Sequence, residues 1–280
     1  MSAQLTPADV SAVVCTRNSV QSIEQCLRSL HAAGVGEVIV VDAHSTDGTR
    51  QVAEGLATSV LQDEGIGLGA ARNLGIAQTT KPLILNMGSD NVLPPRQLQK
   101  MIDLLASQGL AGVSAQTRIP GANYPARGLN AWRKGRFPCG PARIIGTPTL
   151  FQGDLLRANP YDPTRRFSDD SELCERLTAQ FGSRFAISDA EVLEVGKTSW
   201  PEVLVRCRMY GESDAEVFRD GRQQGWSAGR TLQSLAHPMK ADFLEPISRL
   251  HPTEAVVSAP FLGAFTALRY AFWVRKSLDG

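Results

Sequence analysis

The sequence predicts an α/β fold in which a mostly parallel, twisted sheet is flanked by helices. Short apolar runs alternate with longer amphipathic stretches through residues 10–117. The runs V-I-V-V and P-L-I-L-N-M lack the alternation of polar and apolar residues that a half-exposed strand shows, which is typical of strands buried on both faces. Strands that are separated by helices pair in parallel through right-handed crossovers.

The elements follow in order along the chain. Strands are expected at residues 10–15, 38–41, 59–61, 82–87 and 112–115, and helices at 19–33, 47–57, 69–78 and 94–108. Residues 119–146 are rich in Gly, Pro and Arg without a clear period, so a long loop is expected there. Beyond it we expect a strand at 149–151 and helices at 170–180 and 200–219. We therefore predict a catalytic domain at 1–220, with a nucleotide-binding half at 10–117 and an acceptor half at 118–220, and a helical C-terminal extension at 221–280.

The composition is that of a globular protein, with 42% hydrophobic and 20% charged residues. A net charge of +1 gives no overall field that would attract a polyanion, so nucleic acid is not expected as a partner. The five cysteines form no C-x-x-C pair, which argues against a disulfide framework and a structural zinc site. The N-terminus lacks the pattern of a signal peptide, and a cytoplasmic location is expected.

The segment 255–276 leaves two interpretations open. Its uncharged part, A-V-V-S-A-P-F-L-G-A-F-T-A-L, is short for a membrane span and contains Pro260. A buried helix is the favoured interpretation, because Phe and Leu at helical spacing usually form a core. The alternative is an interfacial segment, with Trp273 and the basic residues around it at the level of the headgroups on the inner face of the membrane. A contact with a second subunit, giving a homo-oligomer, also stays open.

Polar residues follow the expected strands at the edge where α/β sheets bind ligands. These residues are Thr16, Arg17 and Asn18 after the first strand, Asp42 and Asp47 after the second, and Ser89 and Asp90 after the fourth. A carboxylate at a strand end can accept hydrogen bonds from a ligand, and a hard divalent cation takes carboxylates together with substrate phosphates. The alternative is that these residues only form turns and helix caps.

Two further motifs carry charged side chains. The segment G-I-G-L-G-A-A-R-N at 65–73 approaches a dinucleotide fingerprint, but the polar Q-D-E before it is not a strand, so that interpretation is rejected. Arg72 there suits a diphosphate, because its guanidinium donates in pairs. Asp169 and Asp170 begin an expected helix, where they act either as caps or, in one case, as a general base.

In this order, the four segments resemble the family-two inverting glycosyltransferases, which have a GT-A fold. The matching residues are Asp42, Ser45, Asp47 and Thr49; Gly67, Ala71, Arg72, Asn73 and Gly75; Ser89 and Asp90; and Asp169, Asp170, Leu173 and Arg176. The resemblance covers roughly residues 10–200. It implies a nucleotide-sugar donor, expected to be UDP-linked, and an acceptor hydroxyl on a saccharide, a lipid-linked compound or a small molecule.

The resemblance also implies roles for individual residues. Thr16, Arg17, Asn18, Asp42, Asp47, Arg72 and Ser89 would contact the donor, and Asp90 would bind Mg²⁺ or Mn²⁺ across its diphosphate. Asp170 would be the general base, with its pKa raised by Asp169. Asp169, Arg176 and Trp200 are candidates for the acceptor side or for support of the residues that contact substrate.

The sequence departs from the family where Gly88 replaces the first Asp of the D-x-D element. This change weakens the implied contact to ribose or metal. It supports an alternative, a catalytically inactive GT-A-like protein that binds nucleotide-sugars. A sugar nucleotidyltransferase is disfavoured because residues 12–19 contain no glycine, and an NAD-dependent oxidoreductase is disfavoured by the argument on residues 65–73.

Overall fold

The computed structural model describes residues 4–164, 169–196 and 198–278. The chain divides into two compact units. The first comprises residues 1–118 and 139–196, and the second comprises 119–138 and 197–280. The boundary thus differs from the one expected at residue 220, because the helix that begins at Trp200 and the segment 119–138 both belong to the second unit.

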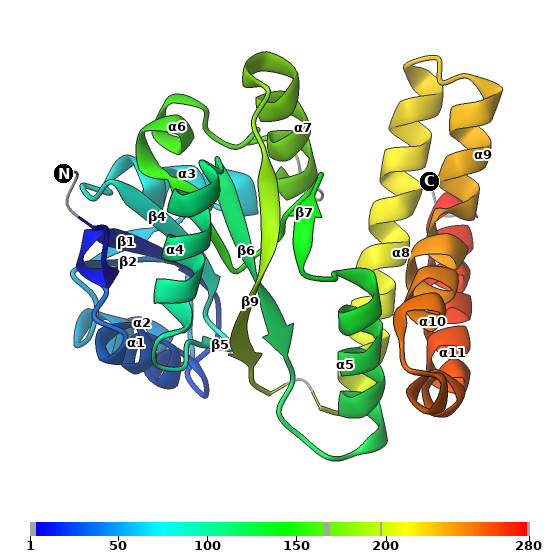
Figure 1. The fold of residues 1–280 in the computed structure, drawn as a ribbon, viewed down its shortest axis with the longest axis horizontal. Coiled ribbons are helices and arrows are strands. Elements are labelled where there is room, and N and C mark those ends of the chain that lie inside the picture. The colour runs from blue at the N-terminus through cyan, green and yellow to red at the C-terminus, as the bar shows by residue number, and fades with distance from the viewer. Residues whose placement is uncertain (1–3, 165–168, 197, 279–280) are drawn as a thin grey trace. The chain divides into compact units, whose positions relative to one another are not determined.

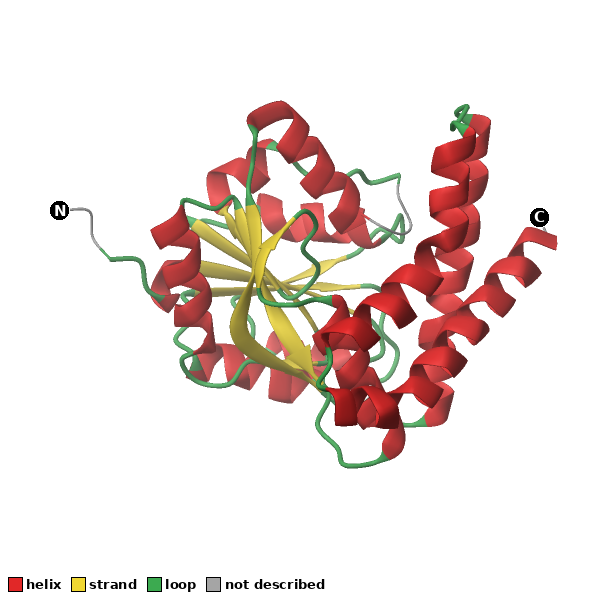
Figure 2. Cartoon of the chain, turned by 45° about the vertical axis from the view of Figure 1, so that its right-hand side comes forward, coloured by secondary structure: helices red, strands yellow, loops and turns green. Residues whose placement is uncertain are grey.

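The first unit is built on a nine-stranded mixed sheet (Figures 1 and 2). Its strand order is β3-β2-β1-β4-β8-β6-β9-β5, with β7 paired to β9. The strands are β1 (Val10–Thr16), β2 (Glu37–Asp42), β3 (Ser59–Gln62), β4 (Leu83–Gly88), β5 (Asn91–Val92), β6 (Gly112–Arg118), β7 (Gly140–Ala142), β8 (Thr149–Gln152) and β9 (Phe185–Glu194). Strands β1 to β4 run parallel, as expected, whereas β8 joins β4 and β6 in antiparallel orientation.

Helices cover both faces of this sheet. They are α1 (Ile23–Ala32), α2 (Thr49–Glu54), α3 (Leu68–Ala77), α4 (Gln97–Gln108), α6 (Gly153–Ala158) and α7 (Asp169–Phe181), and a 3₁₀ turn, η1 (Pro7–Asp9), precedes β1. One hydrophobic core lies between the sheet and α1, α2 and α4, and the other lies between the sheet and α3, α6 and α7. Gly75 allows α3 to pack closely on the sheet, since a Cβ there would lie 2.5 Å from Val13 Cγ1.

The second unit is helical. It contains α5 (Tyr124–Arg136), α8 (Trp200–Gln223), α9 (Ala228–Pro238), the π-helical η2 (Met239–Leu244), α10 (Glu245–Arg249) and α11 (Pro252–Leu278). The expectation of a long loop at 119–146 was wrong, because α5 occupies much of it. Asn123 caps α5 through the backbone N–H of Ala126, and the buried side of the helix carries Trp132, whose neighbours come from α8 and α11.

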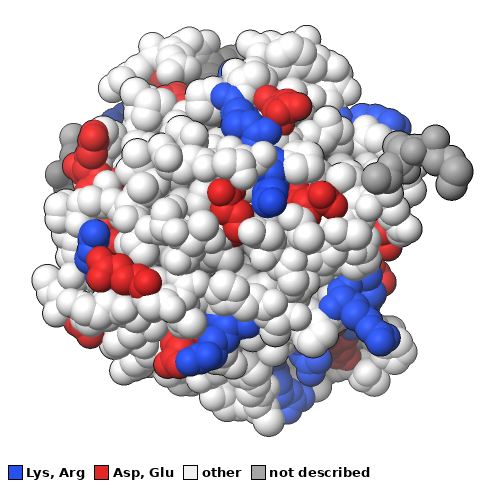
Figure 3. Space-filling view, turned by 90° about the vertical axis from the view of Figure 1, so that its left-hand side faces the viewer, with Lys and Arg blue, Asp and Glu red and all other residues white. Residues whose placement is uncertain are grey.

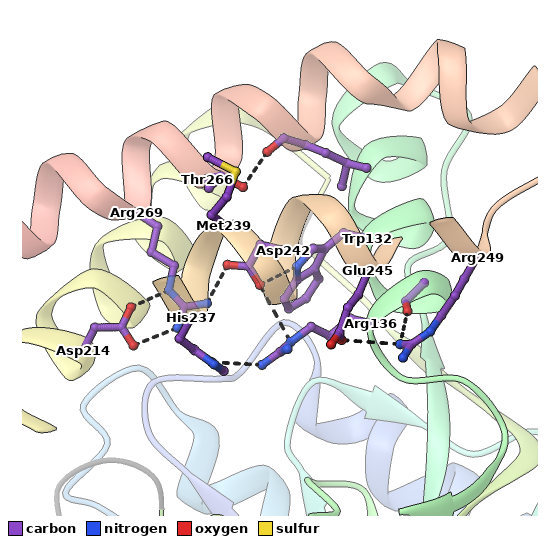
Figure 4. A network of polar contacts seen from close by, with 12 residues as sticks. Trp132, Arg136, Asp214, His237, Met239, Asp242, Glu245, Arg249, Thr266 and Arg269 are labelled. Carbon is purple, nitrogen blue, oxygen red and sulfur yellow. Dashed lines mark hydrogen bonds and ion pairs between the residues drawn. The ribbon is translucent and has the colours of Figure 1, made fainter. Parts of the chain in front are cut away.

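A buried polar network ties these helices together (Figure 4). The fully buried Asp242 of η2 accepts hydrogen bonds from Trp132 Nε1 of α5 and from Arg269 of α11. Arg269 also binds Asp214 of α8 through two nitrogens, at 2.6 and 2.8 Å. Arg136 of α5 lies 3.7 Å from Asp242. Since buried carboxylates and guanidinium groups require partners, this network fixes the register of α5, α8, η2 and α11.

Acidic and basic side chains are interspersed over the face of the molecule that Figure 3 draws, in keeping with a net charge of +1. One helix within the described ranges, α11, is long and apolar enough to cross a membrane by length and composition. One side of this helix packs within the helical unit, where it buries Phe261, Phe265 and Trp273. That side agrees with the favoured interpretation of the segment as a buried helix.

Candidate active site

The parallel strands bring the candidate side chains to one edge of the sheet. Thr16 pairs in register with Asp42, and Gly88 pairs with Cys15, so the carboxyl ends of β1, β2 and β4 lie side by side. This arrangement agrees with the expectation from the sequence that ligands bind outside the ends of these strands.

Two buried polar atoms at this edge have no hydrogen-bond partner among the residues that the structure describes. They are Thr16 Oγ1 and Asp42 Oδ1, in residues that are 5% and 1% exposed. The other carboxylate oxygen of Asp42 accepts a hydrogen bond from the backbone N–H of Ser45 at 3.1 Å. Because buried polar groups in proteins are nearly always paired, these two atoms have unused hydrogen-bonding capacity that a ligand can satisfy.

The loops that follow β1 and β2 are held to each other. The backbone N–H of Asn18 donates to Ser45 Oγ at 2.8 Å, and Asn18 Oδ1 accepts from the N–H of Thr46 at 2.9 Å. Asp47 accepts from the Thr49 hydroxyl at 2.5 Å and from the Val20 N–H at 3.1 Å, and these hydrogen bonds, with that of Thr49 the largest cause, lower the pKa of Asp47. Asn18 and Asp47 therefore hold these two loops together, and any contact of theirs with a donor stays a prediction.

The turn after β4 shows what replaces the first carboxylate of the D-x-D element. A Cβ at Gly88 would lie 2.8 Å from Asp90 Oδ1 and 3.1 Å from Asn91 Oδ1. The carboxylate of Asp90 thus occupies the space beside Gly88. Ser89 Oγ donates to Ser19 Oγ at 3.0 Å, which links this turn to the loop after β1.

Arg72 is paired with carboxylates of the chain itself. Its side chain is 8% exposed and forms ion pairs with Asp169 and, at 3.2 Å, with Asp170. Its other terminal nitrogen donates to Thr147 Oγ1 at 2.7 Å, and its guanidinium lies 5.1 Å from the ring centroid of Tyr161. The guanidinium thus holds the two carboxylates at the start of α7, and the expected contact of Arg72 with a diphosphate stays a prediction.

The pKa of Asp170 is raised above its ordinary value. Burial is the largest cause, and Asp169 adds to it in the direction expected from the sequence. Arg72 opposes the rise, as do hydrogen bonds from the Thr147 backbone and the Tyr161 hydroxyl. A carboxylate with a raised pKa beside a fixed cation is suited to accept a proton.

Tyr161 is a part of the site that the sequence did not reveal. It lies in the loop between α6 and α7, is 1% exposed, and places its hydroxyl 3.4 Å from Asp170 Oδ1. Asn86 Nδ2 of β4 donates to the same hydroxyl at 3.0 Å. The segment Y-D-P resembles an ordinary turn, and nothing in it signals a contact with the carboxylate nine residues later.

The acceptor-side candidates take supporting positions. Arg176 binds Glu172 on its own helix at 2.7 Å and donates to the carbonyl of Pro160, also at 2.7 Å, so it anchors the loop that carries Tyr161. Arg17 is exposed. Trp200 belongs to the helical unit, where its ring lies 6.2 Å from that of Tyr124 and 5.9 Å from that of Phe261.

Comparison with known families identifies the chain. A family model described as "Glycosyl transferase family 2" matches residues 11–169, more than half of the sequence. The chain belongs to glycosyltransferase family 2. The matched region begins in β1 and ends at Asp169, so it contains all three strand ends described above.

Relatives of this family-two glycosyltransferase agree with the assignment. Glycosyltransferase AglE of Haloferax volcanii is 27% identical over 138 residues, which are 46% of this chain and 44% of that protein. The match thus spans less than half of the length of this curated relative.

Two solved structures show the same fold. Mannosyltransferase PcManGT from Pyrobaculum calidifontis, in complex with GDP-Man and Mn²⁺, has a TM-score of 0.64 and 19% identity, covering 98% of this chain and 88% of that chain. S. aureus TarS 1-349 in complex with UDP-GlcNAc has a TM-score of 0.56 and 16% identity, covering 96% and 90%. The GT-A fold expected from the sequence is confirmed.

Proposed function

We propose that this glycosyltransferase transfers a sugar from a UDP-linked donor with inversion, and that Asp170 is the general base. The observation that carries the proposal is the Asp170 carboxylate, which is held by Arg72 and has a raised pKa. It lies in the same unit as the unpaired Thr16 and Asp42 atoms.

The unpaired atoms of Thr16 and Asp42 suit a nucleobase that has a ring N–H beside a carbonyl. An ionised carboxylate such as Asp42 accepts hydrogen bonds but cannot donate one, whereas the Thr16 hydroxyl can donate. Uracil offers that pair of groups, and so does guanine, whereas the corresponding ring nitrogen of neutral cytosine is an acceptor. We propose uracil as the nucleobase, with guanine as the alternative. Both occur among structures of this fold, since the TarS complex contains UDP-GlcNAc and the PcManGT complex contains GDP-Man.

The residues fit a divalent cation that takes most of its ligands from the donor. No group of three His, Cys, Asp or Glu side chains that could hold a metal occurs in the described part of the chain. Asp90 is the carboxylate at the turn where Gly88 replaces the other. Mg²⁺ and Mn²⁺ accept one protein carboxylate with phosphate oxygens, and when bound the cation would stabilise negative charge on the departing diphosphate.

The residues of the chain then divide the chemistry. Asp170 takes the proton of the acceptor hydroxyl, and the acceptor oxygen forms a bond to the sugar carbon on the face opposite the diphosphate. The bond from that carbon to the diphosphate oxygen breaks, and its electron pair stays on the oxygen. Attack from the opposite face inverts the configuration at the sugar carbon.

Two measurements test this proposal. Thermal shifts with UDP, GDP, CDP and dTDP, each with and without Mn²⁺, should show the largest metal-dependent rise in Tm with UDP, since a ligand that binds only the folded state stabilises it. Slow hydrolysis of UDP-GlcNAc and UDP-glucose should be lost in Asp170→Asn and kept in Asp154→Asn, a control whose carboxylate is fully exposed. A rise in Tm with GDP alone would show that guanine, not uracil, is the nucleobase. An active Asp170→Asn protein would show that Asp170 is not the general base. UDP binding without turnover in the wild type would favour the inactive, nucleotide-sugar-binding alternative.

We further propose that the helical unit binds an anionic membrane surface on the cytoplasmic side. The side of α11 that does not pack within the unit exposes Val257, Val274 and Leu278, and Arg275 and Lys276 lie in its last turn. An apolar helix face beside basic residues suits the headgroup region of an anionic bilayer. At such a location the acceptor that we propose is a lipid-linked compound.

Vesicle co-sedimentation tests this surface. The protein should sediment with vesicles of phosphatidylglycerol and much less with phosphatidylcholine, and Val274→Glu/Leu278→Glu should abolish the difference. If the protein ignores both vesicles and the double variant instead turns a dimer into a monomer in size-exclusion chromatography, the face binds a second copy of the chain.

A further inference from the structure

We propose that Tyr161 is a positioning residue that orients the Asp170 carboxylate for proton transfer. This inference rests on the proposed role of Asp170 and adds a residue that the family motifs do not contain. It is carried by the contacts of the Tyr161 ring, hydroxyl and backbone, which all lie within the first unit.

The side chain of Tyr161 is held through its hydroxyl and through the face of its ring. Its hydroxyl accepts a hydrogen bond from Asn86 Nδ2 at 3.0 Å and lies 3.4 Å from Asp170 Oδ1. Because Asn86 supplies the donor to the phenol oxygen, the phenol hydrogen is left for the carboxylate. The face of the ring carries the guanidinium of Arg72 at 5.1 Å, and that guanidinium in turn binds Asp170. Two groups that contact Asp170 therefore also contact each other.

The backbone at Tyr161 is clamped to α3. Asn73 Nδ2 donates to the Tyr161 carbonyl at 2.8 Å, and Asn73 Oδ1 accepts from the Tyr161 N–H at 2.9 Å. Gly69, one turn earlier on α3, would place a Cβ 3.0 Å from the carbonyl oxygen of Asp162, so only a very small residue lets the loop approach this closely. Both backbone polar groups of this loop residue are thus held by one side chain of α3, as a positioning role requires.

The phenol keeps its proton at neutral pH. Complete burial raises the pKa of Tyr161 well above its usual value, and the neighbouring Asp170 raises it further. The hydroxyl is therefore a neutral hydrogen-bond donor at neutral pH. The hydroxyl–carboxylate distance of 3.4 Å is long for a hydrogen bond, and catalytic contacts of this kind shorten when substrate is bound.

The test compares Tyr161→Phe with Tyr124→Phe. The first removes one hydroxyl and keeps the ring that supports Arg72, and the second removes the half-exposed hydroxyl of a tyrosine in the helical unit. Carbon-13 NMR of aspartate carboxyl groups gives the pKa of Asp170 without substrate, with Asp170→Asn to assign its signal. The groups that face this carboxylate are Arg72 from α3, Asp169 and Cys174 from α7, and Tyr161 itself.

Removal of a donor to the ionised form raises the pKa of its partner, and a hydrogen bond to a charged group corresponds to a shift of about 1 unit. We expect Tyr161→Phe to raise the Asp170 pKa by about that amount, to move the acidic limb of UDP-GlcNAc hydrolysis by the same interval, and to lower kcat about tenfold with the Kd for UDP within twofold. Tyr124→Phe should match the wild type. An unchanged Asp170 pKa in Tyr161→Phe overturns the inference even if hydrolysis slows. A protein that hydrolyses neither donor but shows the NMR shift would contradict the proposed function alone.

Discussion

Replacing Arg72 by Met tests the central claim about the site. Arg72 is the cation shared by Asp169 and Asp170, whose side chains are 11% and 21% exposed. Methionine keeps much of the length of the side chain but removes the charge, so two largely buried carboxylates lose their shared partner. Breaking a buried ion pair from one side typically destabilises a protein by about 3–5 kcal/mol. We expect Arg72→Met to lose about that much free energy of unfolding at pH 7.

The pH dependence of the loss has a definite sign. Arg72 lowers the pKa of Asp170, so the variant raises it further above its unfolded value. The folded variant then binds more protons than its unfolded chain over the window between those two values, and its stability falls as pH rises through that window. The deficit relative to wild type should therefore be largest at neutral pH, shrink as pH falls through that window, and level off below about pH 4.

The assay must report on the first unit. All four tryptophans (Trp132, Trp200, Trp226 and Trp273) lie in the helical unit, so their fluorescence does not serve. Hydrogen exchange of peptides from β1 and β4 in urea measures opening of the sheet itself. Arg28→Met, which removes an exposed pair with Glu24, is the control and should cost less than about 0.5 kcal/mol.

Two results would refute this reasoning about Arg72. One is a deficit below about 1 kcal/mol at pH 7, or one that grows on acidification. The other is a Kd for UDP that rises tenfold or more in Arg72→Met while the stability of the sheet is kept. That second result would return Arg72 to the diphosphate contact expected from the sequence.

Three further changes have defined outcomes. Asp242→Asn should lower the urea midpoint of the tryptophan transition, with a loss of about 3 kcal/mol, because it removes a fully buried negative charge that pairs with Arg269. Gly88→Asp adds a second carboxylate beside Asp90, whose side chain must shift to admit the new Cβ, and it should raise the Mn²⁺-dependent affinity for UDP about tenfold, as calorimetry would measure. The pKa of His237 is lowered by burial and by the neighbouring Arg136 guanidinium. Below about pH 6.5 the unfolded chain therefore binds a proton that the folded chain does not, and the helical unit loses stability as pH falls. His237→Gln should flatten this pH dependence in urea titrations monitored by tryptophan fluorescence.

The parallel half of the fold could be predicted because its signals are local. Continuous apolar runs separated by amphipathic segments place β1 to β4 and the helices between them, and Gly34 and Gly109 follow the helices that they end. The antiparallel insertion of β8 between β4 and β6 could not be predicted, because it is decided by contacts between distant residues. Helix α5 was missed for another reason: its glycines at 128 and 135 interrupt the apolar pattern, yet each allows close packing, as at Gly128, where a Cβ would lie 2.3 Å from the Phe261 ring.

The site follows the same division. Thr16, Asp42 and Asp90 could be placed because a strand end fixes where each side chain must lie. Arg72 could be recognised as important but not assigned a partner, since its spacing in the sequence does not reveal that Asp169, 97 residues later, lies beside it. For Asp170 the direction of the pKa shift was anticipated, whereas its main cause, burial, depends on tertiary packing.

Helix α3 explains why these long-range contacts converge. Its small residues, Gly69 and Gly75, let it approach the Asp162 carbonyl on one side and Val13 of β1 on the other. The polar residues between them, Arg72 and Asn73, then reach the carboxylates of α7 and the backbone of Tyr161. A larger residue at either glycine would move the helix and with it both polar groups. The G-x-x-x-A-R-N-x-G segment therefore connects β1, at whose end we expect the donor to bind, to Asp170, the carboxylate that we propose activates the acceptor. This connection does not depend on whether the segment also contacts the diphosphate.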